Sequence, residues 1–216
     1  MQYKAVLFDF DYTLGDATES IMAGYAFAFA EMGIPQPTLE QVRSTVGFIL
    51  EDGYTMLTGD RDESRRARFS GLFREKSHPI QVATTPLFPG ALELLDALKR
   101  ASVATVVVSS KRRKTLCGVL ENTGAMPRLS FALGSDDVHA PKPDPEGILL
   151  ALERLNTRPG EALYCGDTVL DAEAAQRAGT DFCAVLNGTT PASAFDVWPH
   201  VHIAPDLNDL RGYLGL

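Results

Sequence analysis

Two aspartates, Asp9 and Asp11, lie in the segment Asp-Phe-Asp-Tyr-Thr-Leu, directly after the apolar residues 5–8. A short apolar run of this kind is typical of a buried strand, and side chains two residues apart in an extended segment point to the same side. Two carboxylates held together are unfavourable unless a cation or a shared proton compensates their charge. The pair therefore indicates a Mg²⁺ site, an acid/base pair, or both, whereas a polar turn with capping aspartates is the simpler alternative.

The chain contains a second Asp-x-Asp pattern, Asp60-Arg61-Asp62, that serves as an internal comparison. It lies in a polar stretch that is typical of a turn and a helix start, and no apolar run precedes it. The strand before Asp9, rather than the bare spacing, is what gives the first pattern its weight.

Three further polar segments follow apolar runs or stiff turns. Ser109 and Ser110 come directly after residues 103–108, where a hydroxyl and nearby N–H groups can hold a phosphate or simply cap a helix. Lys142 lies between two prolines, as either a phosphate or carboxylate partner or a solvated turn residue. Asp167 follows residues 162–165 within Gly-Asp-Thr-Val-Leu-Asp, and Asp171 falls in the first turn of the next helix, where capping would also explain it.

Helical and apolar segments alternate along most of the chain. We expect helices at residues 91–100, 111–123, 145–155, 170–178 and 206–214, and strands at residues 5–8, 103–108, 131–133, 162–165, 182–186 and 201–204. Such alternation predicts an α/β fold, a Rossmann-like parallel sheet with helices on both faces. Residues 15–84 lack a strand pattern and predict a helical insert, with helices that include Leu50–Leu57 and Glu63–Lys76.

The carboxyl ends of parallel strands lie along one edge of a sheet, where ligands bind in folds of this type. Four of the expected strand ends or turns would bring two acids, hydroxyls, a lysine and two more acids to that edge. A carboxylate nucleophile, a hydroxyl, a cation and a Mg²⁺ site are the parts that phosphoryl transfer requires.

Composition narrows the class of partner and the compartment. The 216 residues carry a formal net charge of −8, which argues against nucleic acid or an anionic membrane as the main partner. No apolar stretch reaches the roughly 18 residues of a membrane span, and no secretory apolar region precedes the first strand. Three widely spaced cysteines predict neither a disulfide framework nor a zinc site. We expect a cytoplasmic monomer or small homo-oligomer.

The four motifs, in this order, resemble the haloacid dehalogenase superfamily. The resemblance rests on residues 9–14, on Ser109, on Lys142-Pro143 and on residues 166–171, and it covers nearly the whole chain. Phosphoglycolate-phosphatase-like members are the most similar, in part because of Phe88-Pro89-Gly90 and Val108-Ser109-Ser110-Lys111. The resemblance implies a catalytic core of residues 1–14 and 85–216, with residues 15–84 as a small helical cap.

The resemblance also implies a function and a role for each motif residue. Asp9 would be the nucleophile that forms an aspartyl phosphate, and Asp11 would be general acid toward the leaving oxygen and then base toward water. Mg²⁺ would be held by Asp9, the Asp11 backbone carbonyl and Asp167, while Asp171 would support the metal or orient Lys142. Ser109, Ser110 and Lys142 would hold the phosphate of a small phosphorylated metabolite.

Position 12 departs from the family, because Tyr12 stands where glycine is common. Glycine tolerates positive φ, so Tyr12 is expected either to reshape the cap hinge or to reach toward the substrate. Gly47, Phe48 and Glu51 are further candidates for substrate selection, since their segment can form a loop over the site.

Two other functions share these parts. A phosphosugar mutase of the same superfamily is the alternative enzyme. A phospho-receiver signalling domain also uses acids, a hydroxyl and a lysine around Mg²⁺, but it is shorter and has no counterpart of residues 15–84.

Overall fold

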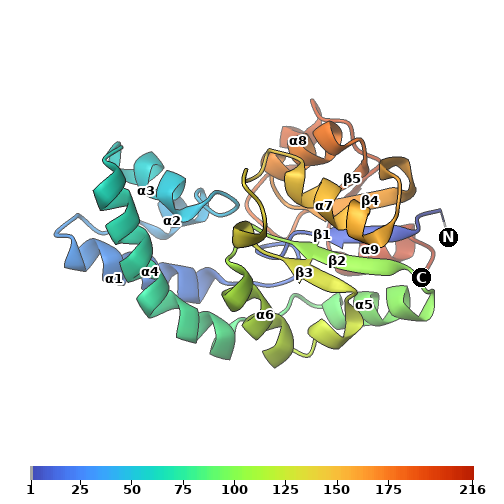
Figure 1. Cartoon of the computed structure of the whole chain (residues 1–216), viewed down its shortest axis with the longest axis horizontal. Helices are drawn as coiled ribbons and strands as arrows, with labels where there is room; N and C mark the ends of the chain where they lie inside the picture. Colours follow the sequence, from blue (N-terminus) through green and yellow to red (C-terminus); the bar gives the residue numbers. More distant parts are fainter. Residues whose placement is uncertain (1) are drawn as a thin grey trace.

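A six-stranded parallel sheet forms the centre of the larger part of the molecule (Figure 1). The computed structural model describes residues 2–216. The strand order is β3-β2-β1-β4-β5-β6, so β2 and β3 are added on one side of β1, and β4, β5 and β6 are added on its other side. The strands are β1 (Ala5–Phe8), β2 (Ala104–Val108), β3 (Phe131–Leu133), β4 (Ala162–Gly166), β5 (Asp181–Val185) and β6 (His202–Ala204). The predicted α/β class and parallel sheet are confirmed.

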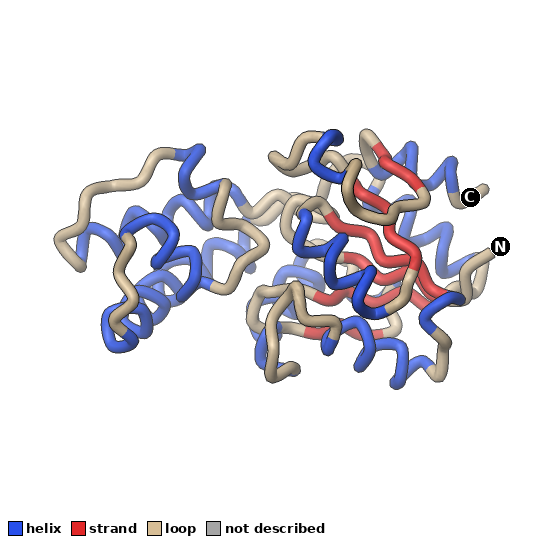
Figure 2. Tube along the Cα trace, turned by 90° about the horizontal axis from the view of Figure 1, so that it is seen from above, coloured by secondary structure: helices blue, strands red, loops and turns tan. Residues whose placement is uncertain are grey.

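Helices cover both faces of the sheet, as Figure 2 shows from above. Side chains alternate along each strand: Val6 and Phe8 of β1 join the apolar cluster beneath α5, α6 and α9, whereas Ala5 and Leu7 join the cluster beneath α7 and α8. These helices are α5 (Ala91–Arg100), α6 (Arg113–Asn122), α7 (Glu146–Leu155), α8 (Val169–Ala178) and α9 (Leu207–Tyr213). Because β1 is buried on both faces, its sequence is continuously apolar, as expected for a parallel sheet.

Four helices form a separate layer beside the sheet (Figures 1 and 2). We call this layer, α1 (Thr18–Glu31), α2 (Leu39–Arg43), α3 (Leu50–Thr58) and α4 (Glu63–Thr84), the helical insert. Its interior is rich in aromatic rings, and Tyr25, Tyr54 and Phe69 are almost completely buried there. The insert therefore has an apolar core of its own.

Two neighbouring chain segments join the insert to the sheet. The Asp16 N–H donates to Pro86 O at 2.9 Å, and the Phe88 N–H donates to Leu14 O at 2.9 Å. The connection before α1 and the connection after α4 therefore run side by side, and they form a narrow paired link between the two parts of the molecule.

The helix predicted at Glu63–Lys76 was too short, because α4 continues to Thr84 through Pro79. Proline lacks an N–H group and removes one helical hydrogen bond. The helix continues nevertheless because its last turns pack against α6. No helix among residues 2–216 is both long enough and apolar enough to cross a membrane.

Candidate active site

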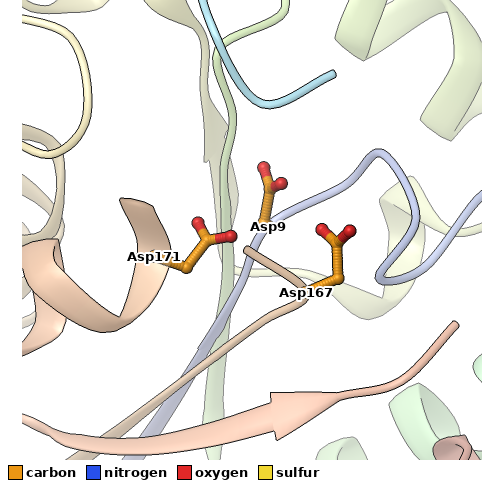
Figure 3. Close-up of side chains that lie close together, drawn as sticks. All are labelled: Asp9, Asp167 and Asp171. Atoms are coloured by element: carbon orange, nitrogen blue, oxygen red, sulfur yellow. The ribbon is translucent and has the colours of Figure 1, made fainter. Parts of the chain in front are cut away.

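Three buried aspartates meet at the carboxyl edge of the sheet (Figure 3). Asp9 follows β1, Asp167 follows β4 and Asp171 lies in the first turn of α8. Since β1 and β4 are neighbours with Phe8 beside Cys165, the next residues of the two strands emerge together. One oxygen from each of the three carboxylates lies within 4.8 Å of the others.

Lys142 supplies a positive charge to this cluster. Its ammonium lies 3.0 Å from Asp9 Oδ1 and 2.6 Å from Asp171 Oδ1, and its side chain is 6% exposed. Burial opposes the charged form of Lys142, but the carboxylates of Asp171 and Asp9 outweigh it and hold the lysine pKa well above its usual value. Lys142 is therefore a fixed cation beside Asp9.

Asp171 is fully engaged by its neighbours. Its Oδ1 accepts from Lys142 and from the Tyr164 hydroxyl at 3.1 Å, and its Oδ2 accepts from the Thr168 hydroxyl at 2.6 Å. The Thr168 backbone N–H also donates to Asp171 Oδ2, and the Asp171 backbone N–H donates to Thr168 Oγ1; these two bonds form a capping box at the start of α8. This geometry favours the second of the two roles expected for Asp171, which is to orient Lys142.

Asp167, unlike Asp171, has a carboxylate oxygen that accepts no hydrogen bond from the part of the chain that the structure describes. No residue of 2–216 donates a hydrogen bond to its buried Oδ1. Burial first, and then the charges of Asp171 and Asp9, raise the pKa of Asp167 well above its usual value. Burial and the neighbouring carboxylates likewise raise the pKa of Asp9, although Lys142 opposes the shift.

Two glycines leave room around these carboxylates. A Cβ atom on Gly188 would lie 2.0 Å from Asp167 Oδ2, and one on Gly166 would lie 2.4 Å from the Asp171 carboxyl carbon. A carboxylate oxygen without a donor, crowded negative charge and close oxygen atoms are the surroundings that a hard divalent cation such as Mg²⁺ requires. The residues at this edge therefore fit a Mg²⁺ ion.

Asp11 lies apart from the cluster of three. Its Oδ2 pairs with Lys111 Nζ at 3.1 Å, and no residue of 2–216 donates to its Oδ1. Ser109 is buried, and its Oγ accepts from the Lys111 N–H at 3.2 Å. Ser110 instead donates its hydroxyl to Gly47 O of the insert at 2.8 Å. The structure thus places Asp11, Ser109 and Ser110 around the Asp9 end of the site.

A cavity of about 300 Å³ lies between the sheet edge and the helical insert. Its floor includes Asp9, Asp11 and Ser109. The wall from the insert combines apolar side chains with polar ones, and it includes Ile21, Gly47, Phe48, Glu51, Phe73, Arg74, His78 and Gln81. Gly47, Phe48 and Glu51, which the sequence singled out for a loop over the site, therefore do line the cavity.

Tyr12 is not among the residues that line this cavity. Its φ is 57°, the left-handed region in which glycine is favoured. The side chain is 2% exposed, its hydroxyl lies 2.9 Å from Thr18 Oγ1, and the Arg43 guanidinium lies 5.4 Å from its ring centre. We expected Tyr12 either to shape the hinge of the insert or to contact the substrate. The geometry favours the first of these roles.

Comparison with known proteins gives the family. The model of the haloacid dehalogenase-like hydrolase family matches residues 6–185, which contain all four motifs. The chain belongs to this family. It is 31% identical over 195 residues to pyrophosphatase PpaX from Bacillus velezensis, with 89% of this chain and 88% of that protein covered. It is 26% identical to phosphoglycolate phosphatase from Escherichia coli, with coverage of 99% and 93%.

A solved structure gives the same result. A haloacid dehalogenase-like hydrolase from Bacteroides fragilis superposes with a TM-score of 0.93 at 34% sequence identity, and the match covers 96% of this chain and 99% of that one. The predicted membership of the haloacid dehalogenase superfamily is therefore confirmed.

The sequence analysis gave no role to several residues that line the cavity. Lys111 and Gln81 contact each other across the cavity, and Arg74 pairs with Glu51 at 3.1 Å. Lys111 directly follows the Ser109-Ser110 motif, so its place in the chain was a usable signal. Arg74 and Gln81 had no such signal, because only the packing of α4 brings them to the cavity.

Proposed function

We propose that this hydrolase removes phosphate from a small phosphate monoester in a Mg²⁺-dependent reaction with an aspartyl-phosphate intermediate on Asp9. Membership of the haloacid dehalogenase-like family, together with the similarity to phosphoglycolate phosphatase, indicates a hydrolase of phosphate esters. The observation that carries the proposal is the position of Asp9, a buried carboxylate on the cavity floor, 3.0 Å from the Lys142 ammonium and beside Asp167.

In the first proposed step, an Asp9 oxygen attacks phosphorus and the bond to the leaving oxygen breaks. Asp11 would donate a proton to that oxygen from the cavity floor, two residues after Asp9. In the second step, Asp11 takes a proton from water as the water oxygen attacks phosphorus. The phosphorus–Asp9 bond breaks, phosphate leaves, and the Asp9 carboxylate is regenerated.

Fixed polar groups would hold the phosphoryl oxygens. Lys142 is locked by Asp9 and Asp171, so its charge is in place before substrate arrives. The Ser109 hydroxyl and the Ser110 backbone N–H lie on the loop after β2 on the same side of the cavity. These groups would stabilise the charge that develops on phosphorus-bound oxygens.

Asp9, Asp167 and the Asp11 backbone carbonyl would hold Mg²⁺, with Asp171 acting through Lys142. The bound ion would neutralise negative charge as the nucleophile and the phosphate approach each other. Asp167 Oδ1 supports this assignment, because it is buried and receives no hydrogen bond from residues 2–216.

We further propose that residues 15–84 act as a cap over a core of residues 1–14 and 85–216. The Ser110–Gly47 hydrogen bond and the shared cavity support closure of the insert onto the core. The cavity of about 300 Å³ has the size of a small-metabolite site. The apolar wall around Phe48 and the Glu51–Arg74 pair favour a leaving group with both an apolar and a polar part.

The test is a Mg²⁺-dependent screen of phosphorylated metabolites with the wild-type protein, Asp9→Asn and a control, Asp196→Asn. Asp196 is exposed and far from the motifs in sequence. We expect Asp9→Asn to lower turnover by at least ~10³ and Asp196→Asn to leave it unchanged. An isomerised phosphosugar product would favour a mutase, and a phosphoprotein that decays slowly without leaving-group preference would favour a receiver domain.

A further inference from the structure

Lys111 is a buried lysine on the cavity wall that the proposed chemistry does not use. Its side chain is 6% exposed, and its ammonium lies 3.1 Å from Asp11 Oδ2. The same ammonium donates a hydrogen bond to Gln81 Oε1 of α4. Since a buried charge is costly unless it is paired, these two partners fix where the ammonium lies. Lys111 thus connects an acid of the core with a helix of the insert.

The backbone of Lys111 belongs firmly to the core. Its N–H donates to Ser109 Oγ at 3.2 Å, and its carbonyl oxygen accepts from the Ser135 N–H at 3.0 Å. A Cβ atom on Gly134 would lie 2.8 Å from that carbonyl oxygen, so the two loops approach closely. The side chain therefore reaches toward the insert from a fixed origin.

Gln81 is equally well fixed on the side of the insert. Its amide nitrogen donates to Ser77 Oγ one turn earlier in α4, which leaves Oε1 for Lys111. The end of α4 lies against α6, where His78 Nδ1 is 2.9 Å from Thr115 Oγ1. A Cβ atom on Gly118 of α6 would lie 2.9 Å from a Val82 methyl group, so the two helices meet closely at this point.

We propose that Lys111 is a positioning residue that makes the orientation of Asp11 depend on the packing of α4 of the helical insert against the core, an inference that rests on the proposed function. With Oδ2 held by Lys111, Asp11 keeps Oδ1 free, and no residue of 2–216 donates to that oxygen. Oδ1 is therefore the atom that exchanges a proton with the leaving group. Without the contact from α4, Lys111 loses Gln81, and its ammonium is no longer held on Asp11 Oδ2 by a second partner.

A direct role in holding the phosphate is the competing role for Lys111. The Lys111 ammonium is already occupied by Asp11 and Gln81, while Lys142 is the cation beside Asp9. The two roles differ in a measurable way. Loss of a phosphate ligand slows every ester, whereas loss of a correctly placed acid slows only esters whose leaving group needs a proton.

The test compares two esters of similar size under single-turnover conditions, p-nitrophenyl phosphate and 4-nitrobenzyl phosphate. The first releases a stable phenolate, and the second releases an alkoxide that requires a proton. In Lys111→Met we expect phosphorylation of Asp9 to slow by about 10–100-fold with 4-nitrobenzyl phosphate and by less than about 3-fold with p-nitrophenyl phosphate. Lys114→Met, an exposed lysine in α6, is the matched control and should match the wild type on both esters.

Two more variants separate positioning from damage to the fold. Lys111→Arg keeps a charge that can pair with Asp11 and should restore most of the rate with 4-nitrobenzyl phosphate. Gln81→Leu removes only the contact from the insert and should show the same ester selectivity, in smaller degree. If thermal unfolding shows that Lys111→Met does not fold, the ester selectivity of Gln81→Leu tests the positioning role instead.

Equal slowing of both esters, or wild-type rates in Lys111→Met and Gln81→Leu, would overturn the inference and leave the proposed phosphatase intact. A wild-type protein that hydrolyses neither ester nor any phosphorylated metabolite would overturn the proposed function itself, and this inference with it.

Discussion

Gly188→Ala adds one methyl group beside a proposed metal ligand. The new Cβ atom would lie 2.0 Å from Asp167 Oδ2, 2.9 Å from its carboxyl carbon and 3.2 Å from its Cβ. The distance to Oδ2 must grow from 2.0 Å to at least 3.4 Å for an ordinary contact, so the Asp167 carboxylate must move by about 1.4 Å. Gly188 is not among the residues with positive φ, so the effect is steric rather than conformational.

A displacement of this size is large for magnesium. Mg²⁺ requires near-ideal octahedral geometry at about 2.0–2.1 Å, and ligand positions are tolerated within about 0.2 Å. We therefore expect Gly188→Ala to raise the Mg²⁺ concentration for half-maximal phosphatase activity by about 10–100-fold, the range seen when groups around a metal ligand are disturbed. Substrate KM at saturating Mg²⁺ should change much less.

The assay is a Mg²⁺ titration of initial rates, with Mg²⁺-dependent thermal stabilisation as an independent readout. Gly71→Ala is the control, because a Cβ atom there meets nothing within 4 Å and the residue lies in the helix α4. Alanine should stabilise that helix by about 0.5–1 kcal/mol without changing the Mg²⁺ requirement. An unchanged Mg²⁺ requirement in Gly188→Ala would refute the placement of the ion against Asp167.

Three further outcomes are expected. Lys142→Met leaves Asp9 and Asp171 without their cation, so urea unfolding in EDTA should show a loss of about 3–5 kcal/mol that Lys114→Met does not share. Phe48→Ala shortens the apolar wall of the cavity, and it should raise KM for an aryl phosphate more than it lowers kcat. Burial raises the pKa of Asp167, so the folded state binds this proton more tightly than the unfolded chain does. In EDTA, the wild type should therefore lose stability relative to Asp167→Asn as pH rises above about 4, the ordinary pKa of an aspartate, measured by urea titration.

The strands and the motif residues could be predicted because both depend on short stretches of sequence. A strand buried on both faces must be continuously apolar, so residues 5–8 could be predicted as a strand. The polar residue that follows such a strand lies at the edge of the sheet. Asp9 lies close to Asp167 because β1 pairs with β4. This pairing is a property of the sheet topology and cannot be read directly from the sequence.

Features that depend on packing between distant segments were not predictable in this way. Gln81 and Lys111 are thirty residues apart, and they meet only because α4 continues through Pro79 and lies against α6. Gly188 belongs to no motif, and its importance lies in the space that it leaves for Asp167. The orientation of Tyr12 depended on Arg43 and Thr18, whose positions are set by the fold of the insert.

The central claim is that Asp9 carries the phosphoryl group during turnover, and an acid quench tests it most directly. The wild-type protein is mixed with excess substrate and Mg²⁺, quenched within milliseconds, reduced with borohydride and mapped by peptide mass spectrometry. We predict that the borohydride-reduced side chain appears at Asp9 in the wild-type protein. The same product should be absent from Asp9→Asn. Turnover without modification of Asp9, or a modification at another residue, would contradict the account.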